Sequence, residues 1–313
     1  MPPPESKSPE TSNSPVVLVT GASGYVGGRL IPLLEQQSVT LRCLARNPDK
    51  LRASVKDFTQ VVQGDVLDAA SLNKALQGVH TAYYLVHLMS GSKDFEKQDR
   101  QAAENFTAAA RKAGVQRIIY LGGLGDDADP KLSPHLRSRH EVGEILRASG
   151  VEALEFRASL VIGTGSLSFD LVKSLTDRLP VMLCPRWLVT PTQPIAVDDV
   201  LAYLLAAREL PPGESRIFEI GGKDVTTYGG MIREYARQRG LRRWLISVPV
   251  LTPYLSSLWL ALVTPAAFEV GRHLIEGLKN PTVVRDTKAL DVFPIRPMGV
   301  QEAIQKAIAT KTM

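Results

Sequence analysis

The chain has 313 residues, of which 44% are apolar and 22% are charged, and its formal net charge is +5. This length and composition exclude a mainly disordered chain and predict a globular protein with a sizeable core. The basic residues are scattered instead of clustered, so the sequence does not predict nucleic-acid binding and favours anionic ligands, phosphorylated cofactors included.

The cysteines and the first residues indicate the cellular compartment. Cys43 and Cys184 are too few for a disulfide framework or a metal cluster, so we predict no metal site and a reducing, cytoplasmic location, with both thiols in the core. Residues 1–15 are rich in Pro and Ser and lack an apolar stretch, which predicts a disordered tail and argues against a secretory signal.

Strand and helix patterns alternate from residue 16 to about residue 162. This alternation predicts βαβ units in a parallel sheet with helices on both faces and a ligand crevice at the carboxyl ends of the strands. The expected strands are 16–20, 39–44, 59–63, 81–86, 117–121 and 153–158, and the expected helices are 25–36, 70–77, 97–113 and 136–148.

The second half is less regular, with a strand expected at 216–222 and a helix at 227–239. We therefore predict a Rossmann-type, doubly wound α/β fold with a smaller, mainly C-terminal substrate-side subdomain. The predicted boundaries are 1–15 for the tail, 16–165 for the Rossmann domain with a return segment near 190–222, and 166–189 with 223–313 for the substrate side.

Residues 244–263 form an apolar run that follows Arg242 and Arg243 and has the length of a membrane span. Pro249 and Pro253 interrupt the run, and four Ser or Thr residues dilute it. We therefore expect a buried or substrate-facing segment, with membrane contact through residues 244–263 as the alternative.

The first expected strand runs directly into a glycine-rich turn, residues 21–28. In a dinucleotide-binding fold, Gly21 makes the tight turn, Gly24 lets the backbone approach the pyrophosphate, and Gly27 allows the helix to pack closely on the strand. The helix N-terminus then offers free N–H groups and a favourable dipole to the anion. The alternative is a glycine-rich turn of another α/β protein. We assign to the cofactor site Gly21, Ser23, Gly24, Tyr25, Val26 and Gly27.

The end of the second expected strand determines the choice of cofactor. About twenty residues beyond the glycines, an NAD-binding fold carries Asp or Glu for the ribose 2′-hydroxyl. Here Ala45 cannot accept that hydrogen bond, whereas Arg46 can bind a 2′-phosphate through its planar guanidinium. The sequence therefore predicts NADP(H) in preference to NAD(H), with a merely solvent-exposed Arg46 as the alternative.

Two further strand ends contribute to the predicted cofactor site. Asp65 can accept from the adenine amino group or cap the following helix, although Asp68 is better placed as the cap. His87 is a titratable group at the crevice or, alternatively, a structural residue of its loop. We assign to the cofactor site Asp65, Val66, Leu85, Val86 and His87.

Residues 20–27, 46–48, 64–66, 84–87, 114–123 and 193–200 carry motifs of a known family. As a set they resemble the extended-like, atypical short-chain dehydrogenase/reductase group, in its NmrA-like, NAD(P)H-binding branch. The resemblance covers residues 16–222 and is looser beyond them. The wider superfamily also places an Asn at the position of Asn105, which either holds a water or kinks the helix there, or is a surface residue in this chain.

The resemblance implies a catalytic Tyr-x-x-x-Lys pair with an upstream serine, and this chain departs from that pattern. The pair reads His135 and Arg139, one helical turn apart, and the serine position reads Gly122-Gly123. An imidazole titrates near neutrality and can relay a proton, whereas Arg139 is too basic to donate one and can hold the ribose. A polar helix start without a catalytic role is the alternative. The candidate catalytic residues are His135, Arg139 and His87, and Arg139 is also assigned to the cofactor.

The substrate side combines apolar residues with a few polar ones, as a small-molecule pocket requires. The candidate substrate residues are Ser159, Phe169, Arg186 and Trp187, each of which is alternatively core or a turn cap. We predict an NADP(H)-dependent oxidoreductase that reduces a hydrophobic small molecule such as an enone, a quinone or a carbonyl compound. The alternative is a non-catalytic NADP(H)-binding sensor or assembly factor, as some NmrA-like proteins are.

Overall fold

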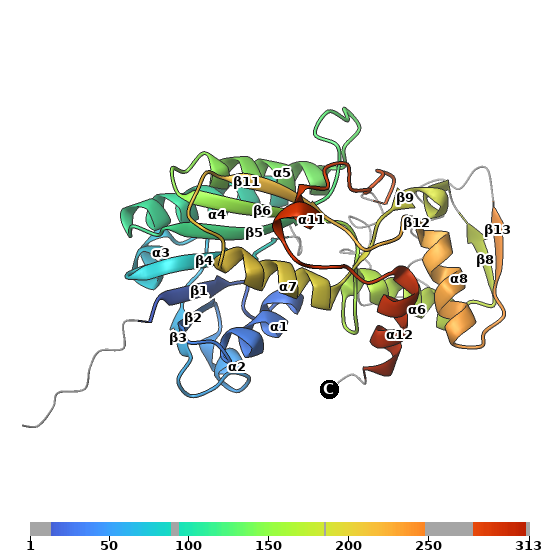
Figure 1. Cartoon of the computed structure of the whole chain (residues 1–313), viewed down its shortest axis with the longest axis horizontal. Helices are drawn as coiled ribbons and strands as arrows, with labels where there is room; N and C mark the ends of the chain where they lie inside the picture. The colour runs from blue at the N-terminus through green and yellow to red at the C-terminus, as the bar shows by residue number, and fades with distance from the viewer. Residues whose placement is uncertain (1–13, 89–93, 185, 248–277, 311–313) are drawn as a thin grey trace, which may run out of the picture.

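The computed structural model describes residues 14–88, 94–184, 186–247 and 278–310. Its centre is a seven-stranded sheet of order β11-β6-β5-β4-β1-β2-β3, in which every hydrogen-bonded pair of strands runs parallel (Figure 1). The predicted doubly wound sheet is confirmed, and the expected strands differ from these by at most two residues at either end. The strands are β1 (Val16–Thr20), β2 (Thr40–Ala45), β3 (Gln60–Gln63), β4 (Val79–Tyr84), β5 (Arg117–Gly123), β6 (Glu152–Ala158) and β11 (Arg216–Ile220).

Successive side chains of the central strands pack into two different cores, because side chains alternate across a strand. Val17 and Val19 of β1 lie in one core, and Leu18 lies in the other. Both faces of the sheet are therefore buried, which is why these strands read as continuous apolar runs. Cys43 is also buried in the first core, as the sequence predicts.

Two layers of helices cover the sheet (Figure 1). One core joins α1 (Tyr25–Leu34), α2 (Pro48–Arg52), α7 (Val197–Arg208) and α11 (Lys288–Val292) to the sheet, and the other joins α3 (Ala69–Ala75), α4 (Phe95–Lys112) and α5 (Pro134–Arg147). The four helices expected between residues 25 and 148 are thus present within two residues of their expected ends.

An aromatic cluster fastens the C-terminal part of the chain to the edge strand β11. The ring of Phe218 lies 5.4 Å from that of Phe156 and 5.1 Å from that of Phe293. Tyr203 of α7 meets Phe293 edge to face at 5.4 Å. These contacts place residue 293 against strands β6 and β11, so the segment around it covers the side of the sheet on which α7 lies.

A buried arginine joins the end of α7 to the sheet. Arg117, the first residue of β5, is 5% exposed, and its Nε and Nη2 both donate to Glu152 Oε2, at 2.9 and 2.7 Å. Its remaining N–H groups donate to the carbonyls of Ala207, Arg208, Leu210 and Pro211. The cation therefore satisfies carbonyls at the C-terminus of α7, where the helix dipole favours positive charge.

A second hydrophobic core lies beyond the carboxyl end of the sheet, around α6 (Leu167–Arg178), α8 (Tyr228–Gln238) and α12 (Val300–Ala309) (Figure 1). The 3-10 helix η1 (Arg186–Val189) follows α6 in the chain. Leu160, from the expected domain 16–165, belongs to this second core, and Phe293, from the expected substrate side, belongs to the first. Each core thus contains segments of both expected domains. The domain boundaries stay a prediction. The short strands pair as β7 (Val161–Ile162) with β10 (Ile195–Ala196), β9 (Pro191–Thr192) with β12 (Thr226–Thr227), and β8 (Val181–Cys184) with β13 (Trp244–Ser247).

The apolar run at 244–263 begins as a strand. Trp244–Ser247 is β13, and residues 248–263 lie outside the described part of the chain. Among the described residues, no helix is both long enough and apolar enough to cross a membrane.

Candidate functional site

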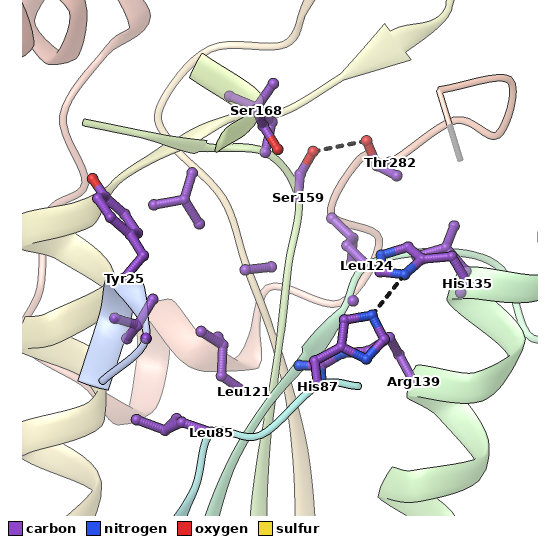
Figure 2. A pocket seen from close by; sticks show the side chains of 18 of the residues that line it. Tyr25, Leu85, His87, Leu121, Leu124, His135, Arg139, Ser159, Ser168 and Thr282 are labelled. Atoms are coloured by element: carbon purple, nitrogen blue, oxygen red, sulfur yellow. Dashed lines mark hydrogen bonds between the residues drawn. The ribbon is translucent and has the colours of Figure 1, made fainter. Parts of the chain in front are cut away.

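A cavity of about 320 Å³ opens where β1, β4, β5 and β6 end, at the point where the strand order switches sides. This is the crevice that the topology predicts. Figure 2 shows Tyr25 on one side of the cavity and His87, His135 and Arg139 on the other. The lining residues include Gly24, Tyr25, Val26, Gly27, Leu85, His87, Leu121, Gly122, Gly123, Leu124, His135, Leu136, Arg139, Ser159, Leu160, Ser168, Tyr228, Leu278, Asn280 and Thr282.

The glycine-rich turn that follows β1 lines one side of the cavity. Gly21 has a φ of +67°, and a Cβ there would lie 2.5 Å from the Leu85 carbonyl oxygen. A Cβ on Gly27 would collide with the carbonyl of Gly21, so α1 packs as closely on the turn as the sequence predicts. Helix α1 begins after Gly24, which is exposed together with Ser23. Its first amides therefore face outward, and the turn fits a dinucleotide pyrophosphate.

Arg46 is the first residue after β2 and is exposed. The next residue, Asn47, is the N-cap of helix α2, and its side-chain oxygen accepts a hydrogen bond from the Lys50 amide at 3.5 Å. The guanidinium thus stands at the strand end where a ribose 2′-phosphate is expected, and its side chain remains accessible to a ligand.

The loop after β3 is held by α4. Asp65 Oδ1 accepts from the Leu67 amide at 3.0 Å, and Asp68 caps α3 through the Ala70 amide at 3.0 Å. Asn105 Nδ2 donates to the carbonyls of Val66 and Leu67, at 3.3 and 3.1 Å. Asp68 is therefore the helix cap, and Asn105 positions the loop expected to cup the adenine.

Three side chains form a hydrogen-bonded chain that ends on the cavity wall. His87 Nε2 lies 2.9 Å from His135 Nδ1 (Figure 2). On its other side, His87 Nδ1 lies 2.9 Å from Asp99 Oδ2. Asp99 of α4 is 3% exposed and also accepts from the Ser138 hydroxyl at 2.8 Å and the Leu88 amide at 3.0 Å. A buried carboxylate is thus connected through one imidazole to a second.

Sequence reasoning missed Asp99, although a signal exists. The buried stripe of α4 includes Phe95, Ala102, Ala103 and Phe106, and Asp99 lies on the same stripe. An acid on the apolar face of a helix is rarely left without a partner, so its position alone pointed to a buried contact.

The charges of His87 and Asp99 follow from their surroundings. Burial lowers the pKa of His87, and the Arg139 charge adds to this, although Asp99 opposes both. Burial alone raises the pKa of Asp99, but hydrogen bonds from His87, Leu88 and Ser138 bring it below its usual value. Near neutral pH, Asp99 is therefore ionised and His87 is neutral. Its single proton is on Nδ1, facing Asp99, so Nε2 accepts from His135 Nδ1–H.

Arg139 lies one turn after His135 on α5, and both line the cavity. Its guanidinium is 4.9 Å from the centre of the Tyr120 ring and donates to the Val86 carbonyl at 3.4 Å. The cation is therefore held at the end of β4, where the nicotinamide ribose is expected. A Cβ on Gly123 would lie 2.8 Å from Leu136 Cδ2, so a serine there would require the Leu136 side chain to shift.

Three hydroxyl groups meet at the far side of the cavity. Ser159 Oγ lies 2.7 Å from both Thr192 Oγ1 and Thr282 Oγ1, and the two threonine oxygens are 2.9 Å apart. Ser159 and Thr282 line the cavity, and Thr192 is buried behind them. Of the four residues assigned to the substrate, Ser159 is the one that the structure places on this wall.

The other three substrate candidates lie elsewhere or cannot be placed. Phe169 is 2% exposed and packs edge to face against Tyr235 at 6.0 Å, within the second core, because α6 turns that face inward. Arg186 and Trp187 belong to η1, and their side chains lie outside the described part of the structure. Tyr228 and Leu278 of the second core reach the cavity instead.

Residues 21–160 match the family model described as NAD(P)H-binding. A ceramide reductase of Caulobacter vibrioides is 27% identical over 82% of this chain and 82% of its own length. A (4-alkanoyl-5-oxo-2,5-dihydrofuran-3-yl)methyl phosphate reductase of Streptomyces griseus is 27% identical over 72% of this chain and 74% of its own. The triphenylmethane reductase of Citrobacter sp. in complex with NADP(H) superposes with a TM-score of 0.74 at 18% identity, covering 93% of this chain and 99% of the other.

The family-model match, the strand order and the glycine-rich turn all point to a dinucleotide-binding protein. Over residues 21–160 the chain is similar to NAD(P)H-binding proteins, and it shares its fold with the triphenylmethane reductase. Where the resemblance to the short-chain dehydrogenases/reductases implies a Tyr and a Lys, this chain has His135 and Arg139, and a buried carboxylate is hydrogen-bonded through His87 to His135.

Proposed function

We propose that this protein is an NADP(H)-dependent reductase of a hydrophobic small molecule such as an enone, a quinone or another carbonyl compound. The cavity supports this proposal because six leucines, at positions 85, 121, 124, 136, 160 and 278, line it together with the cofactor turn. An apolar wall with few polar groups suits such a substrate. Two curated relatives are themselves named reductases.

The observation that carries the proposal is the chain of contacts Asp99–His87–His135. Reduction of a carbonyl or an enone needs a proton as well as a hydride, and the family's tyrosine is missing. An imidazole on the cavity wall that is hydrogen-bonded, through a second imidazole, to a buried carboxylate meets that need.

The reduced nicotinamide supplies the hydride when the cofactor is bound, and the residues of this chain supply the rest. Protonated His135 donates a proton to the substrate atom that takes up negative charge. His87 accepts the Nδ1–H of His135 and, with Asp99, orients that ring and stabilises its positive charge. Arg139, anchored on the Val86 carbonyl, is placed to bind the ribose, and the leucines keep water away from the reacting atoms.

Arg46 tests the choice of cofactor. The Arg46→Ala variant is expected to raise the Kd for NADPH by about 10- to 100-fold, because a charge-assisted contact to the 2′-phosphate is lost. The Kd for NADH should change little. Fluorescence titration of both cofactors measures this, and Arg52→Ala on the same exposed surface is the matched control. Equal weakening of both cofactors in Arg46→Ala would contradict the NADP(H) assignment.

Asp99 tests the relay through its pH dependence. Because the carboxylate opposes the lowered pKa of His87, the Asp99→Asn variant is expected to lower that pKa further. The acidic limb of the kcat profile, where His87 becomes protonated and no longer accepts from His135, should therefore move to lower pH. We also expect kcat to fall about 100-fold, because the amide no longer holds the required tautomer. If kcat instead falls equally at every pH and the acidic limb of the profile does not move, Asp99 has only a packing role.

The second candidate is a non-catalytic NADP(H)-binding sensor or assembly factor. The observation that favours it is the replacement of the whole Ser–Tyr–Lys set by Gly122, His135 and Arg139. NADPH oxidation against a panel of quinones, enones and aldehydes separates the two. Tight NADPH binding without turnover of any member of the panel would favour the sensor over the reductase.

A further inference from the structure

The two-stranded sheet of β8 and β13 has one buried face and one exposed, apolar face. Met182 and Cys184 of β8 point into the second core, at 0% and 6% exposure. The alternate residues of both strands point to solvent, and the parallel register sets Trp244 beside Val181 and Ile246 beside Leu183. We call this the outer face, and its members are exposed by 50% (Val181), 47% (Leu183), 69% (Trp244) and 49% (Ile246).

Arginines border the outer face. Arg242 is exposed two residues before Trp244, and Arg178 is exposed at the end of α6, next to the Pro180 carbonyl that accepts the Trp244 amide at 2.9 Å. The guanidinium of Arg243 is bound to carbonyls at the C-terminus of α6, including Thr176 O at 2.5 Å. Asp177 is the one acid in these two bordering segments, 176–180 and 241–243, so the border carries a net positive charge.

We propose that the outer face docks on an anionic lipid surface. A tryptophan with aliphatic neighbours is the composition that enters the headgroup region of a bilayer, and arginines beside it attract anionic lipids. The chain's net charge of +5 favours the same partner.

Docking there also bears on the cavity, a point that rests on the proposed function. Met182 and Cys184, on the inner side of the same sheet, share the second core with Tyr228 and Leu278, and both of these line the cavity. A lipid surface at the outer face would therefore lie against the part of the protein that borders the apolar wall, on the side from which a membrane-dissolved substrate arrives.

The test is co-sedimentation of the full chain with phosphatidylcholine vesicles that contain or lack phosphatidylserine. We expect binding to the anionic vesicles, reduced about tenfold in Trp244→Ser or Ile246→Ser and about fivefold in Arg242→Glu. The matched controls are Phe58→Ser, which removes a ring that is 60% exposed elsewhere, and Arg111→Glu on α4. NADPH binding by each variant verifies that it is folded.

Three results would overturn the proposal: no binding to either vesicle, equal losses in the controls, or unchanged binding in the outer-face variants. Self-association that Trp244→Ser abolishes, without vesicle binding, would assign the face to a second copy of the chain instead. Because vesicle binding is measured without substrate, its failure leaves the reductase assay unaffected, and failure of the reductase assay leaves the vesicle result unaffected.

Discussion

The His135→Phe variant is expected to lower kcat by about 100- to 10,000-fold, the range that a positioned general acid contributes. Phenylalanine keeps a flat ring of similar size at the start of α5 but has no proton to give and cannot donate to His87. The Kd for NADPH should stay close to that of the unmodified protein, because the glycine turn and Arg46 are untouched. Stopped-flow single-turnover kinetics at saturating NADPH measures the effect on the chemical step.

His80 provides the control for this experiment. It lies near the amino end of β4, is exposed, and contacts Thr81 Oγ1 at 2.9 Å, on the side of the sheet away from the cavity. His80→Phe should leave kcat within about twofold, as surface substitutions usually do. A His135→Phe enzyme that retains most of its kcat would mean that the proton comes from another group.

The Arg117→Met variant is expected to lower the free energy of unfolding by about 3–5 kcal/mol. Methionine fills much of the arginine's volume but leaves the buried Glu152 carboxylate without its cation. It also leaves the carbonyls of Ala207 and Leu210 without a donor at the end of α7. Urea denaturation followed by circular dichroism measures the change in midpoint and slope.

Arg216 makes the matched comparison, because it approaches the same carboxylate from the edge strand. Its Nη2 lies 3.9 Å from Glu152 Oε1 and the side chain is 38% exposed. The Arg216→Met variant should therefore cost no more than about 1 kcal/mol. Similar losses in both variants would show that the carbonyl contacts of Arg117 contribute little.

The central sheet could be predicted from sequence because its signals are local. Buried parallel strands such as Val16–Thr20 read as uninterrupted apolar runs, and the glycine turn after them has its own backbone requirements. Helices α6 and α7 were not predicted. Helix α7 is apolar around most of its circumference, so it lacks the one-sided pattern that reveals a surface helix.

The candidate site was predictable only where one residue's neighbours in sequence define its place. His87, His135 and Arg139 follow from a strand end and a helix start, and all three line the cavity. Asp99 completes the relay from a different helix, 12 residues from His87 and 36 from His135. Thr192 and Thr282 reach Ser159 across 33 and 123 residues. Such pairs depend on the packing of whole elements, which no local pattern contains.

The three hydroxyls of Ser159, Thr192 and Thr282 bias the cavity toward one kind of ligand. Each hydroxyl has a single proton, and the three mutual contacts use all three of them. The three hydroxyls therefore offer a bound molecule only their remaining lone pairs, in either direction of the hydrogen-bonded ring that they form. A ligand that offers an O–H binds there without disturbing the ring, whereas a carbonyl must break one of its contacts. This wall therefore favours a bound O–H group over a carbonyl oxygen.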